Sequence, residues 1–325
     1  MRRSLKARPS VERLEDRLVP SVTASETSSG ILTFQGDKAD GNTVHARDMG
    51  NGTVMATFGN SQTGFVRATF NGVVSVRAIL GDGAGNDYNY QYLSHDITTN
   101  QEVFTGIGNA DSVFIGATKD TQTTTGVNIL VHTKSPTEAS LPSPSPFFSG
   151  DTVRVQLANV ADNAKVNITL DGKHDRGQNQ FTAILGAHTI GTGATVNITE
   201  LAGKSNDRLT AEVTADFNNP DTFADNTPAT DLKGSFNIDL EGGGGAVSEK
   251  VLVNIAKAPF SFPTSTVTEN GGGGAAFVAY EQNDLSNRVL FANLNGGGNR
   301  HSTASIDFDA GQGVLASGFG SVVVS

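Results

Sequence analysis

Short stretches of alternating apolar and polar residues, separated by turns rich in Gly, Asn and Asp, follow one another along most of the chain. Alternation with a period of two predicts β-strands with one buried face, and the Gly, Asn and Asp clusters predict the turns between them. The clearest segments are Val166-Asn-Ile-Thr-Leu-Asp171, Val196-Asn-Ile-Thr-Glu-Leu201 and Phe236-Asn-Ile-Asp-Leu-Glu241. Their recurrence predicts a stacked or serial β architecture.

Two all-β arrangements fit this pattern. In a parallel β-helix or related solenoid, alternating residues such as Val166, Ile168 and Leu170 fill a narrow core, and Asn or Gly occupies the corners. In an antiparallel β-sandwich, the same spacing gives meanders and hairpins. The Gly-rich corners and the low hydrophobic share of 37%, which suits a thin core, favour the β-helix.

A proline-rich stretch divides the chain, with four prolines between residues 136 and 146. Proline fixes φ and donates no backbone hydrogen bond, so this stretch predicts a linker or an excursion. The expected organisation is an N-terminal segment at 1–24, disordered or helical, a β-rich module at 25–134, the linker at 135–150 and a second β module at 151–325.

Charge and composition narrow the partners. The formal net charge is −10, and the chain has no cysteine, which excludes disulfides and thiolate chemistry. Nucleic acid is not expected as a partner, because its recognition relies on clustered Lys and Arg. No apolar run approaches 18 residues, so no transmembrane segment is expected.

One turn has the residue types of a calcium site. In Gly81-Asp-Gly-Ala-Gly-Asn-Asp87, glycines permit a tight turn and carboxylates offer the oxygen ligands that calcium prefers. The candidate ligands are Asp82 and Asp87, with Asn86 a weaker one. The partial second turn at 106–111 could stack on the first. An Asx/Gly turn that binds no ion is the alternative.

The N-terminal string Val11-Glu-Arg-Leu-Glu-Asp-Arg-Leu-Val-Pro-Ser21 resembles the LEPR-XLL-like sorting segment of many exported planctomycete surface proteins. Asp16 occupies the position that family often gives to Pro. By periodicity alone the same string is an amphipathic helix with Val11, Leu14 and Leu18 on one face. The following strands and the turn at 81–87 are similar to degenerate hemolysin-type (RTX-like) calcium-binding repeats. The resemblance implies export to the cell envelope or the extracellular space.

No arrangement of residues typical of a catalytic site is present in the sequence. The six histidines are dispersed, and neither a nucleophile elbow nor a phosphate loop occurs. Glu212 with Asp216, and the trio His174-Asp175-Arg176, are the polar groups an enzyme could use. The sequence therefore predicts a non-enzymatic structural or adhesive protein that contacts a surface glycan or protein. The alternatives are a carbohydrate-active β-helix enzyme and a calcium-stabilised binding module.

Overall fold

The chain is all-β, as expected from the alternating pattern. The computed structural model describes residues 21–324 except 38–40, 107–109, 119, 134–148, 174–176, 187–188, 204–205, 215–230, 256–264, 272–275, 285–289, 296–301 and 309–312. Within these residues there are strands and turns and no helix. The predicted N-terminal sorting segment, up to residue 20, lies outside the described residues.

The strands of the described ranges form three sheets, A, B and C. Sheet A contains, in spatial order, β1 (Val22–Glu26), β2 (Ile31–Gly36), β6 (Ser75–Ile79), β9 (Asn100–Phe104), β12 (Gly126–His132), β15 (Lys165–Asp171), β18 (Thr195–Leu201), β21 (Ser235–Glu241), β23 (Ser265–Asn270), β25 (Leu290–Asn295) and β27 (Gly313–Ser317). Sheet B contains β28 (Ser321–Val324), β26 (Thr303–Phe308), β24 (Ala276–Asp284), β22 (Val247–Ile255), β19 (Asp207–Thr214), β16 (Gln178–Gly186), β13 (Ser149–Leu157), β10 (Ser112–Ala117), β7 (Asp87–Tyr92), β3 (Thr43–Gly50), β4 (Thr53–Asn60) and β5 (Gly64–Phe70). Sheet C contains the short strands β20 (Asp231–Leu232), β17 (Thr189–Ile190), β14 (Asn159–Val160), β11 (Gln122–Thr123) and β8 (Asp96–Ile97).

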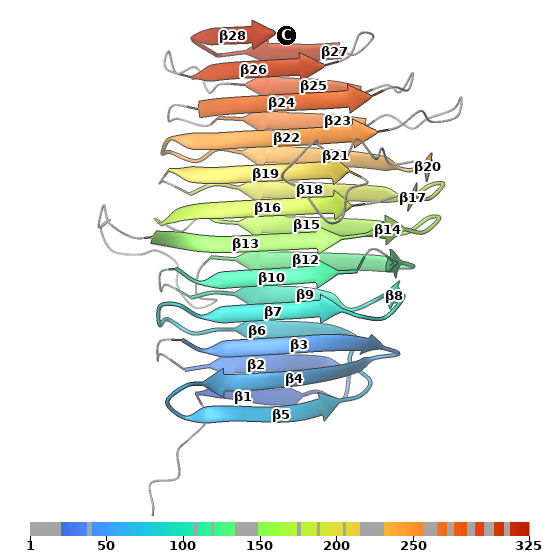
Figure 1. Cartoon of the computed structure of the whole chain (residues 1–325), viewed down its shortest axis with the longest axis vertical. Coiled ribbons are helices and arrows are strands. Elements are labelled where there is room, and N and C mark those ends of the chain that lie inside the picture. The colour runs from blue at the N-terminus through green and yellow to red at the C-terminus, as the bar shows by residue number, and fades with distance from the viewer. Residues whose placement is uncertain are drawn as a thin grey trace, which may run out of the picture.

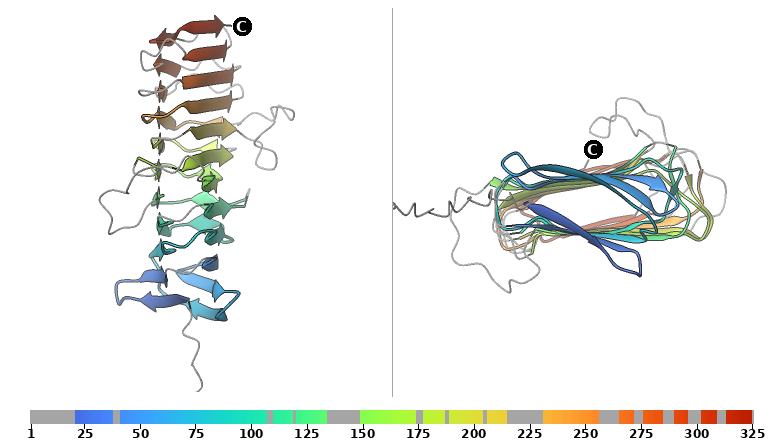
Figure 2. Two further views of the ribbon diagram at one scale, coloured as in Figure 1. Left: turned by 90° about the vertical axis from the view of Figure 1, so that its left-hand side faces the viewer. Right: turned by 90° about the horizontal axis from the view of Figure 1, so that it is seen from below.

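From β6 onward the chain winds in circuits that stack along the long axis (Figure 1). Each circuit adds one strand to sheet A and one to sheet B, and every pairing between circuits is parallel. Seen along the stack, sheets A and B form the two long sides of a flattened outline (Figure 2). This winding is that of a parallel β-helix. Its neighbouring strands come from successive circuits and run parallel, whereas those of a sandwich are joined by hairpins and run antiparallel.

Both long sheets continue across the proline-rich stretch. Strand β12 pairs with β15 in sheet A, and β10 pairs with β13 in sheet B. The stretch at 134–148 itself lies outside the described residues. The parts of the chain before and after it therefore share the same two sheets.

The N-terminal end of the stack is built differently. Strands β1 and β2 pair antiparallel, as do β3, β4 and β5. The β3–β4 hairpin turns at Asn51-Gly52, where both residues have positive φ, 52° and 71°, as a hairpin turn with an Asn-Gly pair requires. The pairing expected of a sandwich thus occurs only at this end of the described chain.

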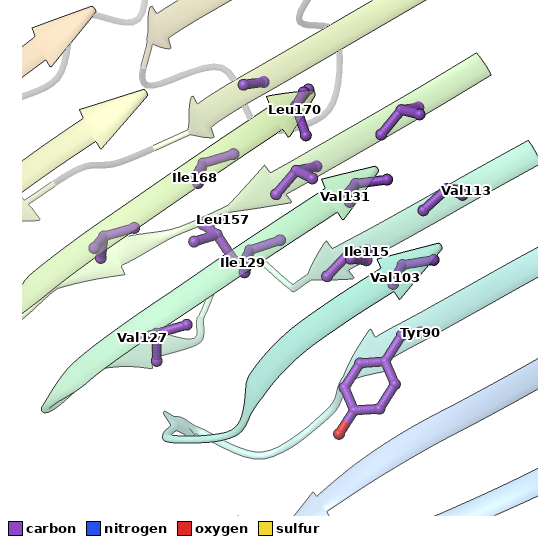
Figure 3. Close-up of a cluster of buried hydrophobic side chains, with 14 of the residues drawn as sticks. Tyr90, Val103, Val113, Ile115, Val127, Ile129, Val131, Leu157, Ile168 and Leu170 are labelled. Carbon is purple, nitrogen blue, oxygen red and sulfur yellow. The ribbon is translucent and has the colours of Figure 1, made fainter. Parts of the chain in front are cut away.

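The core lies between sheets A and B, and its residues form columns along the stack (Figure 3). Because strands of successive circuits pair in register, residues at equivalent positions lie directly above one another. The three segments singled out in the sequence stack in this way, and one column consists of Ile129, Ile168, Ile198 and Ile238. These side chains are at most 1% exposed, so the predicted inward positions are confirmed.

A buried ladder of Asn and Asp side chains, the Asx ladder, follows the corner at which each circuit enters sheet B. Its members occupy equivalent positions at or next to the beginning of successive sheet B strands: Asn42, Asn86, Asp111, Asp151, Asn179 and Asp207. In each step the Oδ1 atom of one residue accepts a hydrogen bond from the backbone N–H of its counterpart in the preceding circuit, at 2.8–3.0 Å.

The ladder supplies the corner backbone with hydrogen-bond partners that the strands do not provide. A buried N–H without a partner costs free energy comparable to a lost hydrogen bond. Asp207 ends the series, and its Oδ2 accepts a further bond from the N–H of Gly203 at 2.7 Å. In the next circuit Val247 pairs with Asp207, so an apolar side chain replaces the ladder there.

We expect Asp151→Ala to lower the free energy of unfolding by about 1–3 kcal/mol, because it leaves the N–H of Asp111 buried without an acceptor. The substitution also removes the acceptor of the Thr105 hydroxyl, now 2.6 Å from Oδ2. Chemical denaturation would measure the loss. The exposed Asp120→Ala is the control, and equal stability of the two variants would contradict a supporting role for the ladder.

Candidate functional site

The three predicted calcium ligands occupy different environments in the structure. Asp82 is partly exposed in the turn, whereas Asn86 is 1% exposed. The Oδ1 of Asn86 accepts from the N–H of Asn42, and its Nδ2 donates to the carbonyl of Gly83 at 2.6 Å. The carboxylate of Asp87 lies 2.7 Å from Nε2 of His45 on the surface of sheet B. Asn86 and Asp87 thus both have partners within the protein.

The stacking expected between the turn at 81–87 and the turn at 106–111 is present at both ends of the turns. Gly106 lies so close to Gly81 that a Cβ at residue 106 would stand 1.8 Å from the carbonyl oxygen of Gly81. At the other end, Asp111 accepts from the backbone N–H of Asn86. Residues 107–109 lie outside the described part of the chain. Both glycines also have positive φ, 96° and 100°, which only glycine adopts readily.

Among the described residues, no three His, Asp or Glu side chains gather in a way that could hold a metal ion. Calcium binding at this turn stays a prediction.

The polar groups considered for catalysis are not brought together within the described chain. Glu212 is 1% exposed on β19, which removes its carboxyl group from solvent. Asp216 and the trio at 174–176 lie outside the described residues.

The outer face of sheet A carries regular rows of amide and hydroxyl side chains. Asn128, Asn167, Asn197 and Asn237 form one row, and each Nδ2 from Asn167 onward donates to the Oδ1 of the preceding asparagine at 2.7–2.9 Å. Beside it, Thr169 pairs with Thr199 in register. Neighbouring strands are about 4.8 Å apart, so these groups repeat at that interval along the stack. The recurring Asn is visible in the sequence, whereas its position in an outer row follows only from the stacking of the strands.

A shallow groove of about 600 Å³ lies on the outer face of sheet B near the N-terminal end, over β3, β4, β5 and β7. The side chains that point outward here form two rows across the four strands. In strand order β7, β3, β4, β5, one row is Asn89, His45, Thr57 and Arg67, and the other is Gln91, Arg47, Met55 and Thr69. No sequence pattern indicated this groove, because its lining residues are spread over 45–91.

A third group of polar residues lies inside the core. Glu200 and Glu269 of sheet A and Glu249 of sheet B are all 0% exposed. In the sheet A column, Glu200 stands between Leu170 and Leu240, and Glu269 follows Leu240. Among the described residues, both carboxyl oxygens of each of the three glutamates are without a hydrogen bond. Alternation in the sequence marks these positions as inward but could not indicate that they lie close together.

Burial raises the pKa of each of these glutamates, because a carboxylate loses its hydration in the core. For Glu249 the rise is from 4.5 to about 8, and the charge of Asp239 adds to the desolvation. The backbone amide of Gly242 offsets part of this shift without reaching hydrogen-bond geometry. The charge of Glu249 in turn raises the pKa values of Glu200 and Glu269. Burial and mutual proximity therefore both favour the protonated form of the three carboxyl groups.

The comparisons with known proteins add no relative to this picture. No protein-family model matches the chain, and no curated protein and no solved structure is significantly similar to it. The described residues contain no helix that is long and apolar enough to cross a membrane. The all-β parallel β-helix is the class that the fold defines.

The calcium hypothesis predicts a higher melting temperature in calcium than in chelator, and a loss of this difference in the double variant Asp82→Asn, Asp87→Asn. Differential scanning calorimetry with and without EDTA measures it. Asn179→Ala, at a ladder position outside this turn, serves as the comparison, because loss of its ladder bond lowers the melting temperature in both conditions. A midpoint that does not respond to EDTA would refute a stabilising ion.

The buried glutamates predict a stability that decreases as pH rises. Since the folded-state pKa of Glu249 is above its unfolded value, its contribution is complete below about pH 4.5 and is lost as pH rises through about 8. Glu249→Leu should flatten this decline and raise the free energy of unfolding at pH 8 by roughly 1–3 kcal/mol. Urea denaturation from pH 5 to pH 9 tests this, with the exposed Glu26→Leu as control. An unchanged slope in Glu249→Leu would contradict the assignment.

Proposed function

We propose that this chain is an exported, non-enzymatic structural or adhesive protein of the cell surface or extracellular matrix. The observation that carries the proposal is the outer face of sheet A, where a row of Asn repeats in register over four circuits with a Thr pair beside it. Such a face offers many equivalent contacts along one direction. Contacts that are individually weak become strong together when a partner engages several of them.

The side chains of this face suit a partner rich in hydroxyl or amide groups. Asn provides both a donor and an acceptor, and Thr provides a hydroxyl that can do either. The rows from Asn128 to Asn237 extend over four successive strands of sheet A. A surface glycan or an extended protein fits this chemistry, and export is supported by the resemblance of the N-terminal string to a sorting segment.

The stacked circuits also suit a structural role. Every described circuit from β6 onward pairs with its neighbours through parallel hydrogen bonds, and the Asx ladder holds the corners from Asn42 to Asp207. An arrangement of this kind keeps the two outer faces at fixed positions along the stack. The proposed role needs such rigidity and requires no catalytic group.

If sheet A is the adhesive face, the double variant Thr169→Lys, Thr199→Lys should reduce retention on an insoluble ligand by about tenfold or more, because two long cations interrupt the row. Cosedimentation with peptidoglycan sacculi, cellulose and chitin measures retention. Thr182→Lys, on the outward side of sheet B, is the matched control. Equal retention of both variants, or no retention of the wild-type chain on any of these surfaces, would contradict the proposal.

A further inference from the structure

The groove over β3, β4, β5 and β7 concentrates positive charge on an acidic protein. The chain as a whole carries −10, yet the groove is lined by Arg47, Arg67 and His45 and by no carboxylate. Of these three, His45 has Asp87 as its partner at 2.7 Å. The local charge is therefore opposite in sign to that of the protein.

The two arginines are available to a ligand. Both side chains are exposed, and within the described chain neither guanidinium group makes an ion pair or hydrogen bond. Two other cations of the described chain do have partners: Arg77 contacts Glu102 at 3.0 Å, and Lys173 contacts Glu241 at 2.7 Å. Charge complementarity therefore calls for an anionic ligand in this groove.

The register places the two arginines apart but on one surface. Arg47 pairs with Met55 on one side of β4, and Arg67 pairs with Thr57 on the other side. The two arginines therefore flank β4 and are offset by two residues along it. Two strand spacings separate β3 from β5, which is about 10 Å. At this spacing each guanidinium group can contact a different charged group of an extended ligand.

The remaining lining residues suit sugar units. Asn89, Gln91, Thr57 and Thr69 offer amides and hydroxyls to ligand hydroxyl groups. Met55, 49% exposed between Arg47 and Thr69, presents an apolar surface of the kind a sugar ring's C–H face contacts. Arginine binds planar carboxylates through two parallel hydrogen bonds.

We propose that this groove binds a carboxylate-bearing polysaccharide, a polyuronate, with Arg47 and Arg67 each contacting the carboxylate of a different sugar unit. The inference goes beyond the proposed function, on which it rests for the presence of an extracellular glycan. It places a second ligand site on sheet B, separate from the adhesive face of sheet A.

The test uses the full chain and soluble polygalacturonate, with binding measured by isothermal titration calorimetry at two salt concentrations. We expect binding that weakens with salt, a loss of affinity of about tenfold for Arg47→Gln and for Arg67→Gln, and a greater loss for the double variant. Arg208→Gln is the matched control, because Arg208 is an exposed arginine on the same side of sheet B in a distant circuit. Circular dichroism and melting temperature confirm that each variant is folded.

Methyl-esterified polygalacturonate and sulfated dextran separate carboxylate recognition from other chemistry. The proposal expects the ester to bind at least tenfold more weakly and the sulfated polymer to show no preference for the wild type over the double variant. It is overturned if wild type does not bind polygalacturonate, if the ester binds equally, or if Arg208→Gln loses as much affinity as the groove variants. Because this measurement is in solution, its failure is distinct from a failure of sheet A to retain the chain on insoluble surfaces.

Discussion

The rest of the structure depends on parallel pairing in register between successive circuits. Once β12, β15, β18 and β21 pair residue by residue, each side chain lies beside its counterpart one strand spacing away. Apolar positions then become continuous core columns, and polar positions become continuous rows. This constraint explains why isoleucines stack on isoleucines inside and asparagines bond to asparagines outside. A charge placed at one inward position would therefore lie directly beside the inward side chains of the two neighbouring circuits.

The corners need a separate solution, because backbone groups in a turn have no partner in the strand ladder. The Asx ladder meets this need from Asn42 to Asp207 with one side-chain oxygen per circuit. Past Asp207 the ladder stops at Val247. Buried Glu249 lies two residues beyond that valine, close to Glu200 and Glu269. The polar groups of the interior thus change along the stack, from Asn and Asp side chains that accept backbone hydrogen bonds to glutamates whose pKa values are raised by burial.

The two outer faces differ in the same physical sense. Sheet A presents neutral rows whose amides already bond to one another. Near the N-terminal end, sheet B presents a groove with two arginines that have no partner among the described residues. The antiparallel strands β4 and β5 create this difference, since they extend sheet B past the parallel circuits. The local change in pairing therefore gives one end of the molecule a surface that the regular circuits do not repeat.

The sequence by itself determined the strands, their inward residues and the all-β class, because alternation and Gly/Asn/Asp turns are local properties. It also indicated that 166–171, 196–201 and 236–241 are equivalent, and the structure pairs them in register. It could not determine which distant residues meet. The sequence marked Asn86 as a possible oxygen ligand for calcium, yet only the stacking of turns shows that its Oδ1 accepts a hydrogen bond from the N–H of Asn42. Likewise, Arg47 and Arg67, 20 positions apart in the chain, share a groove only because of the strand register in sheet B. Glu200 lies near Glu249, 49 positions later, only because sheets A and B face each other across the core.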